Sequence, residues 1–153
     1  MTTDGPTTGS TTGPATAAAQ LRSAGLRVTA ARLAILRTVR ARPHLGAEAI
    51  AALTRDQVGS VSTQAVYEAL NALTDVGLLR RIEPAGSPAR YEDRVGDNHH
   101  HLVCRRCGAV TDVDCVAGQA PCLEPIEDAG YQVDEADVVF WGVCPDCQRT
   151  PAT

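Results

Sequence analysis

Two C-x-x-C pairs, Cys104–Cys107 and Cys144–Cys147, constrain the C-terminal part of this chain more than any other feature of its sequence. Each C-x-x-C turn places two thiolates at two corners of a tetrahedron, and two such turns complete a zinc site. Ligation by sulfur alone is typical of a closed structural zinc, because a catalytic zinc keeps a position for water. Alternatively, these cysteines could be small hydrophobic residues buried in a core without a metal. Their paired spacing argues against this interpretation. We therefore predict a unit folded around Zn2+.

Two further cysteines, Cys115 and Cys122, lie between these pairs. Exposed thiols with a low pKa oxidise to a disulfide, so these two residues are candidates for a redox switch. The alternative is that both are ordinary core cysteines. The sequence places no neighbour beside them that would lower a thiol pKa, which favours the core interpretation.

The chain has no recognisable export or membrane signal. Its N-terminus lacks a basic segment followed by an apolar stretch, and no apolar run reaches the roughly 18 residues of a membrane span. We therefore expect a cytoplasmic protein without a membrane partner, in a compartment where thiols stay reduced. Six cysteines in such a compartment favour metal binding or redox sensing over structural disulfides.

Charge is distributed unevenly along the 153 residues, whose net charge is -4. Residues 15 to 96 carry 11 Arg against 7 acidic residues, whereas residues 97 to 153 carry 3 Arg against 10 acidic residues. A positively charged half can approach a polyanion such as DNA, and a negatively charged half cannot. The N-terminal half is therefore the candidate for binding nucleic acid.

Residues 15 to 93 have the pattern of a winged helix-turn-helix, after a disordered Thr-, Gly- and Pro-rich tail over residues 1 to 14. The predicted helices cover residues 15–24, 29–42, 47–53 and 62–76, with Thr29 and Ser62 as N-caps. In the last of these helices, apolar residues at i, i+3, i+4 and i+7 form one buried face. Strands over residues 78–82 and 89–92 form a β-hairpin across a Pro- and Gly-containing turn. The helix that begins at Ser62 would enter the major groove.

Residues 94 to 98 are polar and are expected to form a hinge to a small α/β unit over residues 99 to 148, followed by a tail over 149–153. The predicted elements of this unit are strands over 102–103, 109–113 and 136–142 and a helix over about 122–129. The run Val138–Trp141 is apolar and β-prone, as in a strand buried on both faces, which indicates a subunit interface. The predicted fold is α+β, a winged helix-turn-helix followed by a dimerisation domain with structural zinc.

Three consecutive histidines, His99 to His101, lead from the hinge into the strand before the first cysteine pair. Side chains alternate along an extended segment, so His99 and His101 point one way and His100 points the other. Two histidines and a carboxylate form a site for a divalent transition metal. Glu92, at the end of the hairpin, is the candidate third ligand and His44 the candidate fourth. A lone histidine such as His44 is usually a surface or capping residue, and spacing alone does not place it near the others.

Several segments of the chain occur in the same order in the ferric uptake regulator family. They are Ala24–Thr29, Val66–Tyr67, Arg90–Glu92, His99–Gly108 and Trp141–Cys147. The resemblance covers about residues 18 to 148, and its histidine-cysteine block is highly specific. Within the family the chain most resembles the actinobacterial branch that represses catalase-peroxidase genes and responds to peroxide.

The resemblance implies a homodimer formed through the C-terminal unit, which binds a double-stranded DNA operator through a winged helix on each arm. The implied regulatory metal ligands are His44, Glu92, His99 and His101. The implied structural zinc ligands are Cys104, Cys107, Cys144 and Cys147. The regulatory ion is expected to be Fe2+ or Mn2+, with Zn2+ as the alternative, because His and Glu ligands do not choose strongly among them.

The resemblance also implies DNA contacts by Tyr67 in the recognition helix and by Arg27 near the minor groove. We expect Ser62 and Gln64, in the helix that would enter the major groove, to contact DNA as well. Many family members have Arg directly after this tyrosine, where the present chain has Glu68. That difference removes a phosphate or base contact and should change sequence preference or weaken DNA affinity.

Some family members carry a further interdomain metal site. The corresponding positions in this chain are Asn98, His100, Gln119 and Ala136. Only His100 offers a metal ligand, so we predict that this site is absent. Peroxide would act either on the histidine ligands of the regulatory metal or on thiols, and the sequence leaves both routes open.

These features predict a metal-dependent repressor of peroxide-defence genes, iron-homeostasis genes or both, in which metal at the hinge favours operator binding. The nearest alternative is a zinc-uptake regulator of the same family. A metalloenzyme is less favoured, because ligands split across a hinge suit switching better than positioning of a substrate. The remaining alternative is a zinc-stabilised interaction module that does not bind DNA. We expect no enzymatic activity and no small organic ligand.

Overall fold

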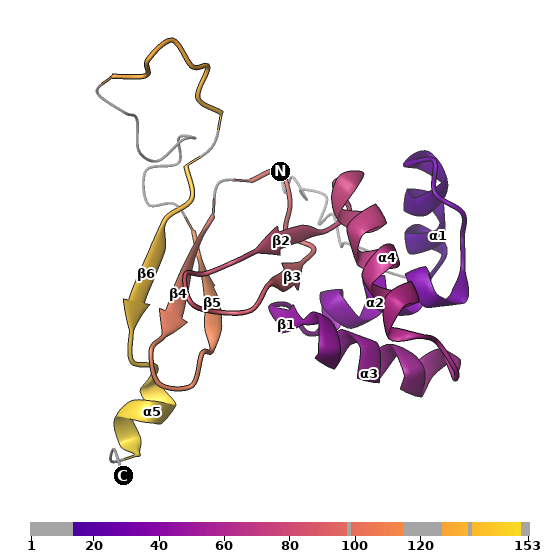
Figure 1. The fold of residues 1–153 in the computed structure, drawn as a ribbon, viewed down its shortest axis with the longest axis horizontal. Coiled ribbons are helices and arrows are strands. Elements are labelled where there is room, and N and C mark those ends of the chain that lie inside the picture. Colours follow the sequence, from indigo (N-terminus) through magenta and orange to yellow (C-terminus); the bar gives the residue numbers. More distant parts are fainter. Residues whose placement is uncertain (1–13, 98, 115–126, 135, 151–153) are drawn as a thin grey trace, which may run out of the picture.

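The chain begins with a helical part and ends with a part built on a three-stranded sheet. Another three-stranded sheet lies between these two parts (Figure 1). The structure is a computed structural model and describes residues 14–97, 99–114, 127–134 and 136–150. The predicted α+β class is confirmed. Cys115 and Cys122 lie outside the described residues, as does most of both predicted tails. No helix of the described residues has the length and apolar character needed to cross a membrane.

Four helices build the N-terminal part. They are α1 (Pro14–Ser23), α2 (Ala30–Ala41), α3 (Ala47–Val58) and α4 (Thr63–Asp75). Both predicted N-caps are confirmed, since Thr29 Oγ1 accepts a hydrogen bond from Arg32 N and Ser62 Oγ accepts one from Ala65 N. The helices share one core, whose fully buried side chains include Leu21, Ile35, Leu36, Ile50, Leu70 and Leu73.

Helix α3 is longer than the helix predicted over residues 47–53. Thr54 continues its buried face, and the helix extends to Val58 before Gly59, whose φ of +79° lies in the left-handed region. The Arg55 guanidinium then connects the end of α3 to the start of α4. Its Nε donates to Val61 O over 3.1 Å and its Nη2 to Thr63 Oγ1 over 2.6 Å. These bonds fix the turn of the helix-turn-helix.

The first sheet is antiparallel, in the order β1-β3-β2. Its strands are β1 (Leu45–Gly46), β2 (Arg80–Ile82) and β3 (Arg90–Glu92). Strands β2 and β3 are the predicted hairpin. Strand β1 was not predicted, because two residues are too few to show an alternating pattern. It brings His44 to the end of the hairpin, where His44 N donates to Tyr91 O over 2.8 Å.

The second sheet has the order β5-β4-β6. Its strands are β4 (His100–Cys104), β5 (Val110–Val113) and β6 (Val139–Gly142), and β6 leads into helix α5 (Pro145–Arg149). Strand β5 is antiparallel to β4, whereas β6 is parallel to it, with Cys104 beside Gly142. Because β4 and β6 run in the same direction, the C-x-x-C turns that follow them meet at the same edge of the sheet.

Two predictions for this part need correction. Residues 127–129, the described end of the helix predicted over about 122–129, are not helical, and Ala129 has a φ of +51°. The rest of that helix lies outside the described residues. The strand predicted over residues 136–142 begins only at Val139.

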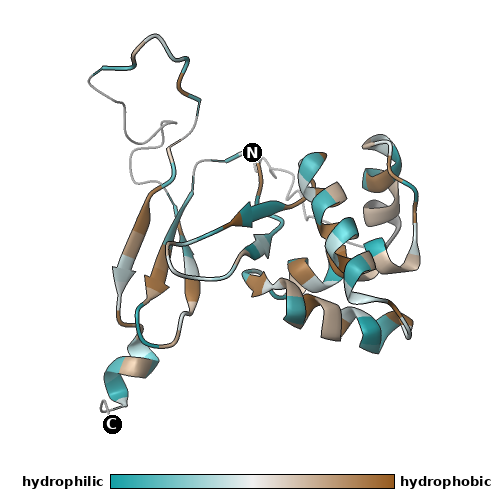
Figure 2. Ribbon diagram, viewed as in Figure 1, coloured by the Kyte–Doolittle hydropathy of each residue, from teal (hydrophilic) through white to brown (hydrophobic). Residues whose placement is uncertain are grey.

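The run Val138–Trp141 is not buried on both faces within a single chain. Phe140 is 48% exposed and lies beside Leu102, which is 46% exposed, in the parallel register of β4 and β6. Figure 2 shows the hydrophobic stretches of these two strands next to each other. One face of the second sheet therefore offers apolar surface to a partner.

Candidate metal centres

The four cysteines of the two C-x-x-C pairs form one cluster. Their Sγ atoms all lie within 4.8 Å of one another. Cys107 Sγ lies 3.7 Å from Cys144 Sγ. Zinc–sulfur bonds of about 2.3 Å in a tetrahedron separate two sulfurs by about 3.8 Å. The cluster therefore fits a four-coordinate zinc, and Cys104, Cys107, Cys144 and Cys147 would hold it.

The thiols of this cluster differ in acidity. The backbone N–H of Cys144 lies 3.3 Å from Cys104 Sγ and, together with N–H groups of the first turn, lowers the pKa of Cys104 to about 6. Hydrogen bonding with Cys144 and Cys107 raises the pKa of Cys147 to about 12. Crowded thiols deprotonate one after another, because each thiolate opposes the formation of the next. A dipositive ion removes that repulsion and is the natural occupant of such a cluster.

The first cysteine turn also contacts the first sheet. Gly108, which follows the turn, has a φ of +71°, and a Cβ atom there would lie 3.3 Å from Arg90 Nη2. The same guanidinium donates through Nη1 to His44 O over 3.0 Å. Arg90 therefore lies beside the zinc turn and binds the backbone of a candidate regulatory ligand.

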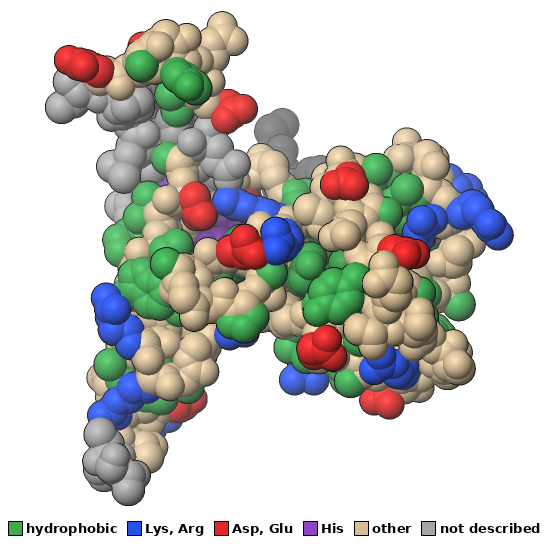
Figure 3. Space-filling view, viewed as in Figure 1, with side chains coloured by type: hydrophobic (Ala, Val, Ile, Leu, Met, Phe, Trp, Pro, Cys, Tyr) green, Lys and Arg blue, Asp and Glu red, His purple; other side chains and the backbone are tan. Residues whose placement is uncertain are grey.

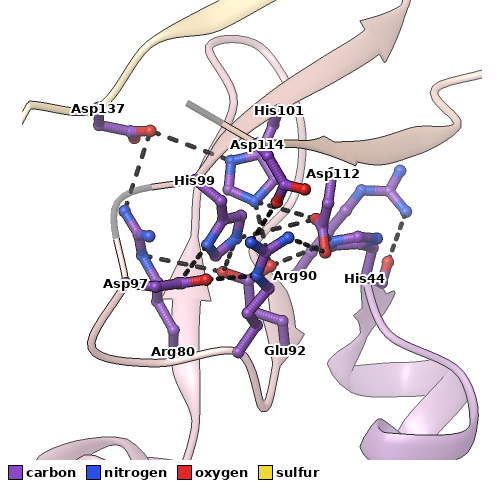
Figure 4. Close-up of polar contacts among 11 residues, drawn as sticks. His44, Arg80, Arg90, Glu92, Asp97, His99, His101, Asp112, Asp114 and Asp137 are labelled. Atoms are coloured by element: carbon purple, nitrogen blue, oxygen red, sulfur yellow. Dashed lines mark hydrogen bonds and ion pairs between the residues drawn. The ribbon is translucent and has the colours of Figure 1, made fainter. Parts of the chain in front are cut away.

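The predicted regulatory residues converge between the two sheets (Figure 4). Glu92 Oε2 lies 3.0 Å from His44 Nε2 and 3.1 Å from His101 Nε2. Glu92 Oε1 lies 3.1 Å from His99 Nε2. Three imidazole nitrogens thus face one carboxylate, although His44 comes from the segment before β1 and the other two from β4 or its start.

A fifth residue, Asp112 on β5, belongs to this cluster and was not predicted from the sequence. Its Oδ1 lies 2.7 Å from His44 Nε2, 3.6 Å from His101 Nε2 and 3.8 Å from His99 Nε2. Asp112 is the register partner of His101, so both side chains lie on the same face of the sheet. That signal was available once the strands around residues 102 and 111 were paired as a hairpin.

The cluster has the burial and the unpaired atoms of a metal site. The side chains of Glu92, His99 and His101 are at most 1% exposed. Among the described residues, Glu92 Oε1, His99 Nε2 and Asp112 Oδ1 have no hydrogen-bond partner of acceptable geometry. Buried polar atoms without partners are costly, and a shared cation would satisfy all three. Ligand atoms of His44, Glu92, His101 and Asp112 all lie within 4.8 Å of one another, as a divalent ion with nitrogen and oxygen ligands requires, and His99 Nε2 lies at the side of this group, 3.1 Å from Glu92 Oε1.

The electrostatics of the cluster favour positive charge. Burial alone would raise the pKa of Glu92, but hydrogen bonds with His101 and His44 and the charges of the histidines lower it far below its usual range. Burial alone would lower the pKa of His44, but Glu92 and Asp112 raise it above its usual value. Without a metal the site attracts protons, which would compete with metal binding.

His44 has an unusual backbone conformation. Its φ is +65°, in the left-handed region that residues other than glycine seldom occupy. The hydrogen bonds from its N–H to Tyr91 and to its carbonyl from Arg90 hold it there. Strained backbone held by its surroundings is typical of functional sites, and here it aims the imidazole at Glu92.

His100 points away from this cluster, as the alternation along the strand predicts. It is 5% exposed, and neither ring nitrogen has a hydrogen-bond partner among the described residues. In the space-filling view, only small areas of histidine are visible between charged side chains (Figure 3).

The four predicted DNA-binding residues are all on exposed positions of the helical part. The Ser62 hydroxyl oxygen caps α4 by accepting a hydrogen bond from Ala65 N. Gln64 Nε2 donates to Glu68 Oε1 over 3.1 Å, and Tyr67 OH donates to Glu48 Oε1 over 3.3 Å. Arg27 precedes α2, and its carbonyl accepts a hydrogen bond from Arg32.

Comparison with known proteins identifies the family to which this fold belongs. The model of the ferric uptake regulator family matches residues 23–140. The transcriptional regulator FurA of Mycobacterium tuberculosis is 56% identical over 130 residues, which cover 85% of this chain and 88% of that protein. Ferric uptake regulation protein 1 of Mycolicibacterium fortuitum is 56% identical over 121 residues, which cover 79% of this chain and 75% of the relative.

A solved structure supports the same relationship. The ferric uptake regulator of Vibrio cholerae superposes with a TM-score of 0.64 at 25% identity, covering 83% of this chain and 98% of that one. The family match extends over residues 23–140, and the alignment with the Mycobacterium tuberculosis relative covers 85% of this chain. This chain belongs to the ferric uptake regulator family.

Proposed function

We propose that this chain is a cytoplasmic, metal-dependent DNA-binding repressor whose affinity for its operator rises when a divalent ion binds between the two sheets. The observation that carries the proposal is the origin of the five ligands. His44 precedes β1 and Glu92 ends β3 in the first sheet, whereas His99, His101 and Asp112 belong to the second sheet and its start. Shared ligation would hold the winged helix in one orientation relative to the second sheet.

Orientation matters because a dimer must place two recognition helices at the spacing of two half-sites. If the connection were loose, DNA binding would have to order the two arms, and the entropy lost would weaken DNA affinity. Metal ligation would order the arms before DNA binds. Differential metal affinity for the ordered state gives a coupling of about 1–3 kcal/mol, or about 5–150-fold in DNA affinity.

The DNA contacts we assign are those of Arg27, Gln64 and Tyr67, with Ser62 positioning the start of α4. The hydrogen bonds that Gln64 and Tyr67 make with Glu68 and Glu48 must be exchanged for contacts with bases or phosphates. A carboxylate near phosphates is unfavourable, so Glu68 should make this helix selective rather than tightly binding.

The dimer we propose uses the exposed apolar face of the second sheet. Leu102, Phe140 and Val143 are each 39% to 48% exposed in the single chain. A cavity of about 400 Å3 lies beside them, lined by residues of β4, β5 and β6 and the second cysteine turn. Covering apolar surface of this kind is the main driving force for association of subunits.

The regulatory ion we favour is Fe2+ or Mn2+. Three imidazole nitrogens and two carboxylates offer five ligands, more than the four that a zinc site usually takes, and carboxylate oxygen suits Mn2+ well. We assign the target genes to peroxide defence, iron homeostasis or both. A zinc-uptake regulator remains the second candidate, since imidazole also suits Zn2+.

The deciding experiment measures DNA binding with and without the regulatory ion. Purified dimer with zinc at the cysteines is titrated onto fluorescent operator DNA in the presence of Mn2+, anaerobic Fe2+ or added Zn2+. Anisotropy should report tighter binding with the cognate ion, and the binding should weaken as salt rises. Equal affinity with every ion and with none would overturn the proposal.

A further inference from the structure

The segment between the two sheets carries an ion-pair network next to the regulatory cluster. Asp97 Oδ1 lies 2.7 Å from Nδ1 of His99, on the opposite side of the ring from Glu92. Asp97 Oδ2 accepts a hydrogen bond from Arg94 Nε over 2.5 Å. Each oxygen of this carboxylate therefore has a different partner.

Arg94 extends the network to strand β5. Its Nη2 donates to Asp114 Oδ1, and its Nη1 lies 3.9 Å from Asp112 Oδ2. The other oxygen of Asp112 is the one that lies 2.7 Å from His44. One guanidinium thus reaches His99 through Asp97 and reaches Asp112 directly.

We infer that Asp97 is a positioning residue that holds His99 as an Nε2 ligand, and that Arg94 holds Asp97 in place. This inference rests on the proposed function, in which His99 binds the regulatory ion. A carboxylate beside Nδ1 keeps the ring proton on that nitrogen, so the lone pair stays on Nε2, which faces Glu92 and Asp112. It also fixes the plane of the ring and makes the imidazole a better donor to a cation.

The segment between the sheets does more than connect them, because it carries the two residues of this network. Arg94 and Asp97 are 37% and 40% exposed, while the His99 side chain is fully buried. An exposed ion pair contributes little to stability by itself. Here the Arg94–Asp97 ion pair matters because it sets the orientation of the buried His99 ring. Outer carboxylates of this kind typically change metal affinity by about 10–100-fold.

The test compares Asp97→Asn and Arg94→Gln with the parent and with Asp134→Asn, a control at an exposed carboxylate outside this network. The protein keeps zinc at the cysteines and is stripped of exchangeable metal. Long-range 1H–15N spectra at pH 8 then report which ring nitrogen of His99 carries the proton, with His99→Gln used for assignment. The parent and the control should show a proton on Nδ1, whereas Asp97→Asn should lose it and carry the ring proton on Nε2, which faces Glu92.

Mn2+ titration of the same proteins gives the second readout. Asp97→Asn should bind Mn2+ about 10–100-fold more weakly. Arg94→Gln should give a smaller loss in the same direction. Parental spectra and parental Mn2+ affinity in Asp97→Asn would overturn the inference. Parental Mn2+ affinity in His99→Gln would instead overturn the role of His99 as a ligand, and so the proposed site, while the ring-nitrogen signals would still report the contact with Asp97.

Discussion

His44 Nε2 and Asp112 Oδ1 lie 2.7 Å apart, which joins the segment before β1 to strand β5 of the second sheet. The two residues are far apart in the sequence, and His44 directly precedes the first sheet whereas Asp112 belongs to the second. Glu92 lies within 3.0 Å of the same imidazole nitrogen. The contact between the two parts of the chain is therefore made at the cluster that we assign to metal binding.

Replacing His99 or His101 by Ala should abolish the metal-dependent gain in operator affinity, expected at about 5–150-fold in the parent. Both variants should remain folded dimers, because the zinc cluster is untouched. DNA binding by anisotropy and mass by light scattering provide the measurement. Asp56→Ala is the control, since Asp56 is exposed on α3 outside the cluster and should leave the metal response intact. Operator affinity equal to that of the metal-loaded parent in either variant would contradict the assignment.

Asp112→Ala should weaken regulatory metal binding by at least about tenfold, since even outer-sphere partners of metal ligands reach this magnitude. Its carboxylate completes the set of oxygen ligands, and its loss leaves His44 with Glu92 alone. Isothermal titration with Mn2+ measures the effect. The exposed carboxylate of Asp56 on α3 provides the control, and Asp56→Ala should bind Mn2+ like the parent. Unchanged affinity in Asp112→Ala would show that the cluster binds the ion through four residues.

The stability of the protein without regulatory metal should depend on pH through Glu92 and His44. Glu92 has a lowered pKa in the fold, so its contribution is present above its ordinary pKa of 4.5 and is lost as the pH falls through the folded value. His44 has a raised pKa, so its contribution is present below 6.5 and is lost as the pH rises through the folded value. Both contributions are present between pH 4.5 and 6.5.

Thermal denaturation from pH 4 to 8 tests this expectation. The decline in Tm above pH 6.5 should be shallower in His44→Gln, which removes the group whose folded pKa is raised. A decline equally steep in parent and variant would assign the pH dependence to other groups. Added Mn2+ should raise the parental Tm most at the higher pH, because protons then compete least for the ligands.

Cys104→Ser should lose the structural zinc and unfold the second sheet, because the free energy of metal binding is part of the free energy of folding there. The cysteine turns end β4 and β6, so their separation would release both strands. Zinc content and circular dichroism give the readout. Strong chelation of the parent should have the same effect, whereas His101→Ala should keep its zinc. A folded, zinc-free Cys104→Ser protein would contradict the prediction.

Phe140→Glu should convert the dimer to a monomer at micromolar concentration. The substitution puts a charge at the centre of the exposed apolar face, where Leu102 lies beside it. Light scattering after size exclusion reports the mass. Val76→Glu is the control, since Val76 is exposed at the end of α4 and away from this sheet. An unchanged mass for Phe140→Glu would place the interface elsewhere.

The parts of this protein that could be predicted from the sequence are governed by neighbours along the chain. Thr29 and Ser62 cap helices because their side chains reach N–H groups three residues ahead. The spacing of the two C-x-x-C turns alone predicts a sulfur site. The alternation of side chains along an extended segment predicts that His99 and His101 point to one face and His100 to the other. The predicted length of helix α3 was too short, because the prediction stopped before Thr54, a polar residue that the core buries.

The regulatory cluster was decided by tertiary structure. His44 reaches Glu92 only because the two-residue strand β1 pairs with β3, and Asp112 reaches His44 only because β5 pairs with β4. Strand pairings of this kind depend on packing over the whole chain, which no local pattern records. Residue types and periodicity therefore indicated the sulfur cluster and the shared direction of His99 and His101, while the packing of two sheets determined that His44, Glu92 and Asp112 lie beside them.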